Sequence, residues 1–278
     1  MRIDEVLNKA TAALASTSDS ARLDSEILLA HYLGKSRSYL YAWPEVTVTA
    51  SALQHFEQAI EQRQTQYPVA YIIGYQEFWS LKLNVTPDVL IPRADTELLV
   101  ETTLDKLQSI KQPNILELGT GSGAIALALA SERPDAHIIA CDYSVKALDV
   151  AKQNQQQLAI SNVSFLHSDW FKAIPTRRFD LIVSNPPYIN PDDPHMHTSI
   201  RFEPLQALCA NDQGLADLSH IVSTAKSYLN PNSWLLLEHG YDQGEQVPQL
   251  LQQAAYQQVN CLPDLAGNDR ISIGQFVS

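Results

Sequence analysis

The sequence has few cysteines, no long apolar run and no excess of basic charge. Its three cysteines, Cys141, Cys209 and Cys261, lie far apart without a C-x-x-C pair. That pattern is typical of reduced, partly buried thiols and not of a disulfide or zinc framework. The longest apolar run, residues 124–130, is far too short to cross a bilayer, and residues 1–5 show no signal-peptide pattern. We therefore expect a cytoplasmic protein without a membrane partner.

The charge balance limits the partners that this chain can bind. The net charge is -12 over 278 residues. Such a balance argues against a large electrostatic footprint on nucleic acid or on an anionic membrane, although it leaves a local basic patch open. The length allows one large domain with a smaller one beside it. No segment resembles a spare apolar interface, so we expect a monomer.

The first quarter of the chain differs from the rest in its pattern of apolar residues. Residues 1–73 carry apolar side chains at helical spacing, with Gly34 as a helix stop and Thr49 as a helix cap. We interpret them as a small helical domain that either recognises a substrate or serves as a structural cap. Residues 74–93 alternate like a β-hairpin and are then broken by Pro87 and Pro92, which predicts a linker.

Residues 94–278 alternate between helix and strand patterns. We expect five strands, at 114–118, 137–141, 163–166, 179–183 and 234–237, with two short strands near 258–262 and 270–276. We expect one helix from 95 to 107 and a second that follows a glycine loop and ends at 132. Further helices are expected at 144–158, 215–229 and 244–255. This alternation predicts an α/β fold, a mostly parallel sheet with helices on both faces.

A glycine-rich segment follows the first strand of this region. Three glycines alternate with other residues in Glu117-x-Gly119-Thr120-Gly121-Ser122-Gly123. Glycines between a strand and a helix let the backbone approach a ligand closely. Asp142 ends the next strand, where a carboxylate can accept from both hydroxyls of a ribose. Nicotinamide and S-adenosylmethionine (SAM) sites share this arrangement, so it predicts a nucleoside without choosing between them.

Two further residues follow the third strand. Asp169 can accept from an exocyclic amine, and the ring of Trp170 can cover a purine. The alternative interpretation is a buried tryptophan beside a helix-capping aspartate.

The fourth strand ends in Asn185-Pro186-Pro187-Tyr188. Asn185 offers an acceptor oxygen, and the prolines remove backbone donors and fix φ. In this topology the fourth strand runs beside the first, so the motif faces the glycine loop at the switch point where ligands bind. The motif supplies acceptors for a planar –NH2 group but neither a general acid nor a nucleophile. It therefore favours methyl transfer to nitrogen over hydride transfer.

Together these motifs resemble the HemK/PrmC family, which are class I SAM-dependent methyltransferases that methylate the glutamine of the Gly-Gly-Gln motif in peptide-chain release factors. Essentially the whole chain takes part in the resemblance. Its more specific segments are 68–74, 91–97, 201–204 and 235–240. The family implies a Rossmann-like sheet whose last strand is antiparallel.

The resemblance also implies which residues bind. Cofactor contacts are expected from Glu117, residues 119–123, Asp142, Asp169, Trp170 and Asn185, with S-adenosyl-L-homocysteine as the product. Asn185, Pro186, Pro187 and Tyr188 would receive the substrate glutamine, with release factors as the protein partner. In the expected mechanism Asn185 and the Pro186 carbonyl accept the two amide hydrogens, and Tyr188 packs against the amide plane.

Three alternatives stay open from the residues. One is methylation of a glutamine in a ribosomal protein, and another is N6-adenine or N4-cytosine methylation of nucleic acid, which the negative charge disfavours. The third is a SAM-binding module without catalysis. His195-x-His197 lacks further ligands, so we expect no metal. The segment 190–214 is expected to fold over the substrate, with a salt bridge between Arg201 and Glu203 as the simpler interpretation.

Overall fold

The computed structural model describes residues 1–193, 196 and 198–277, which form two compact units. The first unit comprises residues 1–75 together with 198–202. The second comprises the described residues of 76–196 and 203–277. Within these residues no helix has both the length and the apolar character needed to span a membrane.

The first unit is a bundle of short helices. They are α1 (Ile3–Leu14), α2 (Ala21–Leu33), α3 (Arg37–Ala42), α4 (Ala50–Gln64) and α5 (Val69–Ile73). The apolar faces of α1, α2 and α4 form its core. Gly34 ends α2 in the left-handed conformation, with φ of 62°, and the Thr49 hydroxyl accepts from the Ala52 amide at the start of α4. Both predicted helix boundaries are confirmed.

The first unit also contains a segment that is distant in sequence. Residues Ser199–Phe202 form the short 3-10 helix η3. The Arg201 guanidinium donates to the Thr65 carbonyl at 2.9 Å, and the Phe202 ring meets Tyr67 edge-on at 5.1 Å. A partly buried ion pair joins Arg63 to Asp24 at 2.7 Å in the same unit.

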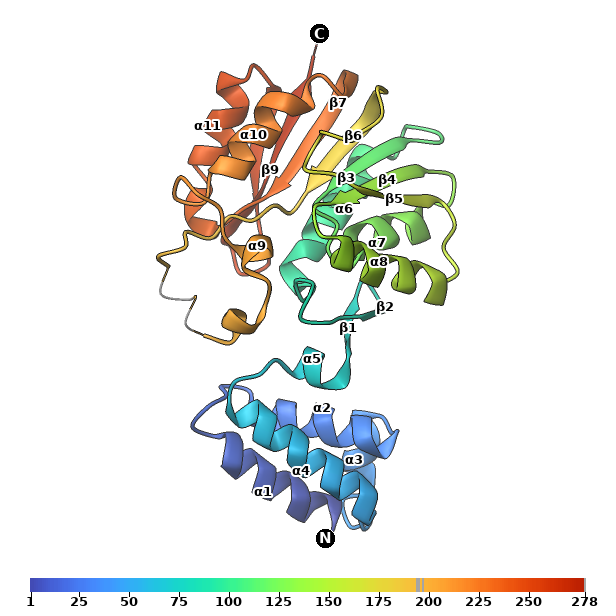
Figure 1. Cartoon of the computed structure of the whole chain (residues 1–278), viewed down its shortest axis with the longest axis vertical. Helices are drawn as coiled ribbons and strands as arrows, with labels where there is room; N and C mark the ends of the chain where they lie inside the picture. Colours follow the sequence, from blue (N-terminus) through green and yellow to red (C-terminus); the bar gives the residue numbers. More distant parts are fainter. Residues whose placement is uncertain (194–195, 197, 278) are drawn as a thin grey trace. The chain divides into compact units, whose positions relative to one another are not determined.

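The second unit is built on a seven-stranded sheet (Figure 1). A hairpin of β1 (Tyr75–Phe78) and β2 (Leu81–Asn84) comes before it in the chain. The sheet has the order β5-β4-β3-β6-β7-β9-β8. Its strands are β3 (Asn114–Leu118), β4 (His137–Asp142), β5 (Val163–His167), β6 (Phe179–Ser184), β7 (Leu229–Glu238), β8 (Gln257–Pro263) and β9 (Asp269–Phe276). All neighbours from β5 to β7 pair in parallel, and β9 pairs antiparallel with both β7 and β8. The predicted sheet with an antiparallel last strand is confirmed.

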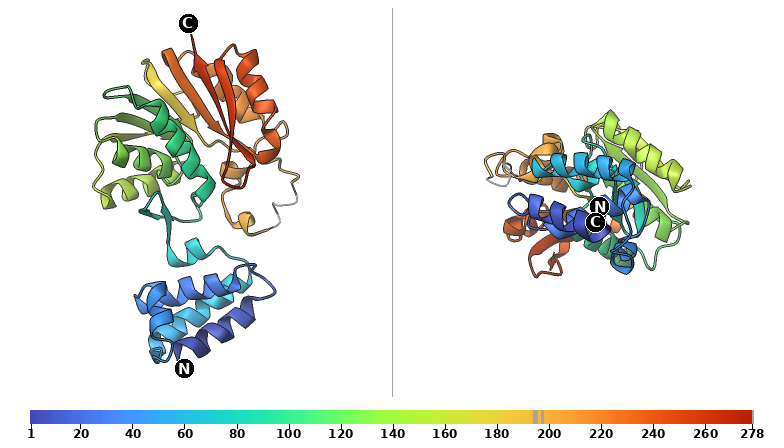
Figure 2. Two further views of the ribbon diagram at one scale, coloured as in Figure 1. Left: turned by 180° about the vertical axis from the view of Figure 1, so that it is seen from behind. Right: turned by 90° about the horizontal axis from the view of Figure 1, so that it is seen from below.

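Helices cover both faces of this sheet (Figure 2). The helices α6 (Glu97–Lys106), α7 (Ala124–Glu132) and α8 (Val145–Gln157) pack on one face, and α10 (Ala216–Ala225) and α11 (Gln246–Gln253) pack on the other. Strand residues alternate between the two cores: Ile115 faces the first helix layer and Leu116 the second. The connections from β3 to β4 and from β4 to β5 cross toward the β5 edge of the sheet, whereas the connection from β6 to β7 crosses the opposite way. Because all of these crossovers are right-handed, the helices of the two halves lie on opposite faces.

The segment before β7 differs from its prediction. The helix expected at 215–229 ends at Ala225, and β7 begins at Leu229 instead of at Trp234. Leu229 is fully buried and lies in register with Phe179 of β6. Pairing with β6 is irregular after Leu229 and resumes at Trp234, so the strand spans Pro231 in a segment where the sequence predicted no strand.

Candidate functional site

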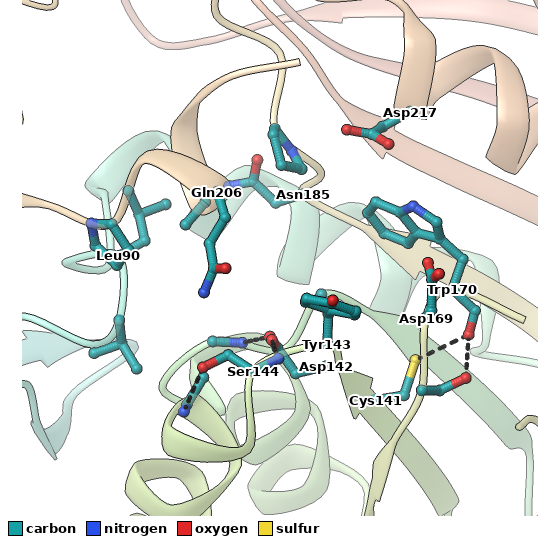
Figure 3. A pocket seen from close by; sticks show the side chains of 18 of the residues that line it. Leu90, Cys141, Asp142, Tyr143, Ser144, Asp169, Trp170, Asn185, Gln206 and Asp217 are labelled. Carbon is teal, nitrogen blue, oxygen red and sulfur yellow. Dashed lines mark hydrogen bonds between the residues drawn. The ribbon is translucent and has the colours of Figure 1, made fainter. Parts of the chain in front are cut away.

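A cavity of about 350 Å³ lies at the carboxyl ends of the adjacent strands β3, β4, β5 and β6 (Figure 3). The chain runs outward from β3 through β4 to β5 and then returns to β6 on the other side of β3. Such a reversal leaves a crevice above the strand ends, where α/β folds bind ligands. The predicted neighbourhood of the first and fourth strands is confirmed by the pairing of β3 with β6.

The glycine loop brings backbone close to the cavity. Gly119 and Gly121 line it, with φ of 74° and 55°, in the left-handed region that favours glycine. The Gly119 and Thr120 amides both donate to the Cys141 carbonyl at 2.9 Å, which ties the loop to β4. A Cβ atom on Gly119 would stand 3.8 Å from the Trp170 ring and 3.9 Å from the Asn185 carbonyl oxygen. Gly119 therefore lies where three predicted site segments meet.

Four other residues of this segment do not line the cavity among the residues that the structure describes. They are Glu117, Thr120, Ser122 and Gly123. Gly123 packs against α7 and α8, because a Cβ there would lie 3.1 Å from Leu127 and 3.2 Å from Ala151. These residues are placed to support the loop. Direct contact between them and a cofactor stays a prediction.

Glu117 is a fully buried carboxyl group behind the loop. Its Oε2 accepts from the Thr120 hydroxyl at 2.7 Å, while Oε1 has no hydrogen-bond partner among the described residues. Burial raises the pKa of Glu117 to about 8, the Thr120 hydrogen bond opposes that shift, and the nearby Asp142 charge adds to it. Glu117 is therefore protonated over most of the physiological pH range.

Asp142 ends β4 and faces the cavity. Its two oxygens accept from the Gly121 and Ser144 amides, each at 2.8 Å. Burial raises the pKa of Asp142, and these backbone donors oppose the shift. A carboxylate has about four lone-pair positions, so each oxygen keeps capacity to accept from a ligand hydroxyl. The geometry suits a ribose.

Trp170 follows β5 in a strained conformation. Its φ of 48° is unusual for a bulky residue. The Trp170 carbonyl accepts from the Ser168 hydroxyl at 2.6 Å, and the same hydroxyl accepts from the Ala173 amide at 3.0 Å. This small network holds the turn, so the indole projects into the cavity (Figure 3). Asp169 also lines the cavity and pairs with Lys172 at 2.6 Å.

The four-residue motif after β6 is divided between cavity and interior. Asn185 and Pro187 line the cavity, whereas Pro186 is buried and Tyr188 is half-buried; neither is among the described lining residues. The Tyr188 hydroxyl lies 3.5 Å from Glu238 at the end of β7, and burial raises the pKa of Tyr188. The motif backbone is tightly packed, because a Cβ on Gly214 would overlap the Tyr188 carbonyl oxygen. The substrate contacts expected of these residues stay predictions.

Several lining residues were missed by sequence reasoning. Asp217 in the first turn of α10, the exposed ring of Tyr143, Gln206 on α9 (Leu205–Leu208) and the segment 88–90 all line the cavity. Figure 3 shows Asn185 and Asp217 across the hollow from Asp142, Tyr143 and Ser144. Burial raises the pKa of Asp217, and a hydrogen bond from Trp170 opposes the shift. No local pattern marks these positions, since they meet only through the fold.

The prediction of a salt bridge between Arg201 and Glu203 is wrong. Glu203 instead pairs with Arg93 at 2.6 Å and accepts from the Ile91 amide at 3.0 Å. A buried glutamate needs such partners, and the segment before α6 supplies them from 110 residues away. His195 and His197, considered above as metal ligands, lie outside the described residues.

Comparisons with known proteins cover both units. A family model described as the PrmC N-terminal domain matches residues 5–74, and a methyltransferase domain model matches residues 110–271. The chain is 51% identical to "Release factor glutamine methyltransferase" of Pseudomonas aeruginosa over 93% of this chain and 94% of the relative. It is 47% identical to the protein of that name from Shewanella oneidensis, over 99% and 96%. Among solved structures, the hMettl16 catalytic domain matches with a TM-score of 0.58 and 14% identity over 82% of both chains, which shows the shared fold.

Proposed function

Because this chain belongs to the release factor glutamine methyltransferase family, we propose that it transfers a methyl group from SAM to the glutamine side-chain amide in the Gly-Gly-Gln motif of peptide-chain release factors. The observation that carries this proposal is the position of Asn185. It lies in a cavity with Asp142 and Trp170, where a nucleoside and an amide can meet. Release factors act in translation, so the proposal places the enzyme in the cytoplasm, where it acts as a monomer.

The cavity residues fit SAM by their chemistry. The carboxylate of Asp142 can accept from ribose hydroxyls, the Trp170 indole can cover a purine, and the absence of a Cβ on Gly119 leaves space beside Trp170. When bound there, SAM supplies an electrophilic methyl group on its sulfonium. The remaining task of the chain is to position the acceptor nitrogen.

An amide nitrogen is a weak nucleophile because its lone pair is delocalised. The side-chain oxygen of Asn185 and the carbonyl of Pro186 would accept the two N–H bonds of the target glutamine. Those hydrogen bonds orient the nitrogen and stabilise the positive charge that develops on it. No strong base is needed, since the nitrogen loses a proton easily once it carries the methyl group. The helical domain at residues 1–73 and the hairpin linker at 74–93 would contribute recognition of the release factor.

The test uses purified full-length protein and labelled SAM with three substrates: a release factor, ribosomal proteins and DNA. We expect label only on the release factor, on the Gly-Gly-Gln peptide by mass spectrometry, and none when that glutamine is replaced by alanine. Measured at saturating SAM, the variant Asn185→Ala should lose at least about 100-fold in transfer rate. Asn260→Ala, on the exposed edge strand β8, is the matched control and should be unaffected. Label on ribosomal protein or DNA alone would overturn the proposal.

A further inference from the structure

Gln206 extends an uncommitted side-chain amide into the cavity. It is an exposed residue of the short helix α9 and one of the described lining residues. Its amide forms no hydrogen bond with any other residue that the structure describes. Figure 3 shows this amide pointing into the hollow, at some distance from Trp170 and Asp169. Gln206 therefore brings two N–H donors and one acceptor oxygen to whatever occupies the cavity.

The backbone on either side of α9 is fastened to other segments. Before the helix, Glu203 accepts from the Ile91 amide at 3.0 Å and pairs with Arg93 at 2.6 Å. At its end, the Leu208 carbonyl accepts from the Ile189 amide at 2.9 Å, directly after the Asn-Pro-Pro-Tyr motif. Because its backbone is held in this way, a side chain on α9 can bind a ligand with a small loss of conformational freedom.

The cavity offers many acceptors but few free donors. Its described lining residues include no lysine or arginine, but they include four aspartates, Asp88, Asp142, Asp169 and Asp217. The backbone amides of Gly119 and Gly121 are committed as well, since both already donate to groups at the end of β4. A positive group on a ligand would therefore find many partners here, whereas a negative group would find few.

SAM carries groups of both kinds, because its sulfonium and ammonium are positive and its carboxylate is negative. A nucleoside held by Asp142 and Trp170 leaves the side of the hollow with Gln206 and Leu90 for the amino-acid part (Figure 3). We propose that the N–H groups of Gln206 bind the carboxylate of SAM and make the site selective for a cofactor that carries it. This inference rests on the proposed function and deepens it.

The two polar ends of the Gln206 amide predict opposite effects of one substitution. If the N–H groups bind the carboxylate, Gln206→Glu places two negative groups against each other and weakens the binding of SAM. If the amide oxygen instead accepted from the ammonium group, the glutamate would attract that group and strengthen binding. The sign of the change in SAM affinity therefore separates the two contacts.

The experiment measures ligand binding by calorimetry in the full chain and its variants. The ligands are SAM, decarboxylated SAM and methylthioadenosine, which lacks the whole amino-acid part. Gln206→Met keeps the length of the side chain but removes its amide, so the affinity for SAM should fall about 10-fold. Its affinities for the other two ligands should stay within about twofold of the wild type. Gln206→Glu should weaken SAM at least as much without weakening decarboxylated SAM.

The matched control is Gln249→Met, at an exposed position of α11, which should bind all three ligands as the wild type does. Equal losses for SAM and decarboxylated SAM in Gln206→Met would overturn the inference, and so would tighter binding of SAM by Gln206→Glu. Methylthioadenosine reports on the nucleoside half of the site. Weaker binding of this ligand would show a general change in the cavity and would equally refute the contact.

Methyl transfer to a release factor gives a second readout. The KM for SAM should rise about 10-fold in Gln206→Met, while kcat stays within about twofold, because the carboxylate is bound equally before and during transfer. A rise confined to the KM for the release factor would assign Gln206 to the protein substrate and contradict the inference. If the wild type binds SAM but leaves release factors unmethylated, the proposed function is wrong, yet the comparison of ligands still decides the role of Gln206.

Discussion

Replacing Glu117 by glutamine should make the protein more stable at neutral and alkaline pH. The carboxyl group is fully buried, and one of its oxygens has no partner among the described residues. Its pKa is raised from an ordinary 4.5 to about 8. A group with a raised pKa contributes stability that is complete below the unfolded-state pKa and is lost as the pH rises through the folded-state pKa. Glutamine resembles the protonated acid in shape and does not titrate, so Glu117→Gln escapes this loss.

The magnitude follows from the separation of the two pKa values. At about 1.4 kcal/mol per pH unit, a shift from 4.5 to about 8 corresponds to an upper limit of about 5 kcal/mol. The gap in unfolding free energy between Glu117→Gln and the wild type should therefore widen steadily from pH 5 to pH 8 and then level off. The SAM affinity of Glu117→Gln, measured alongside, tests the separate prediction that Glu117 contacts the cofactor.

The assay is urea unfolding followed by tryptophan fluorescence at several pH values. Three of the four tryptophans, at positions 79, 170 and 234, belong to the unit that contains Glu117. Glu101→Gln makes the same substitution at an exposed position of α6 and serves as the control, with a small, pH-independent effect. A gap that stays flat from pH 5 to pH 8 would refute the reasoning. A gap that narrows would mean that Glu117 is ionised and stabilised in the folded protein.

Three further outcomes are expected. Asp142→Asn should weaken SAM binding about 10- to 100-fold in calorimetry, because a charged acceptor contributes ~1.5–3 kcal/mol; unchanged affinity would exclude a ribose contact. Gly214→Ala should lower both the melting temperature and methyl transfer, at a cost of about 1–3 kcal/mol beyond that of Gly267→Ala. The two glycines have nearly equal φ, 87° and 85°, but only Gly214 lacks space for a Cβ, so equal losses would contradict this account. Arg63→Met should destabilise the helical unit by about 3 kcal/mol, since it leaves the Asp24 carboxylate buried without its cation; in a double-mutant cycle Asp24→Asn should restore most of that loss, and independent effects would argue against the pair.

Much of the fold could be predicted from the sequence, because its signals are local. Apolar runs of about five residues, separated by segments with helical periodicity, indicate buried parallel strands. The strands predicted at 114–118 and 179–183 are confirmed nearly to the residue. Turn chemistry is also local: Gly34, Gly119 and Gly121 occupy the left-handed conformations that such positions require. The order of strands follows from the right-handed crossovers, so it could also be predicted that the glycine loop lies beside Asn185. The family resemblance, which relatives confirm over nearly the whole chain, added the expected methyl acceptor, a glutamine side chain.

The parts that needed the tertiary structure are contacts between residues far apart in the chain. Glu203 pairs with Arg93 instead of the nearby Arg201, and β7 extends to Leu229 because β6 lies ready to pair with it. Asp217 reaches the cavity only because α10 packs beside the turn at Trp170. The burial of Glu117 and Glu238, and hence their raised pKa values, depends on layers of side chains from both faces of the sheet. Periodicity and turn chemistry act over a few residues and can be read along the chain, whereas burial and charge pairing depend on where the whole chain places its segments.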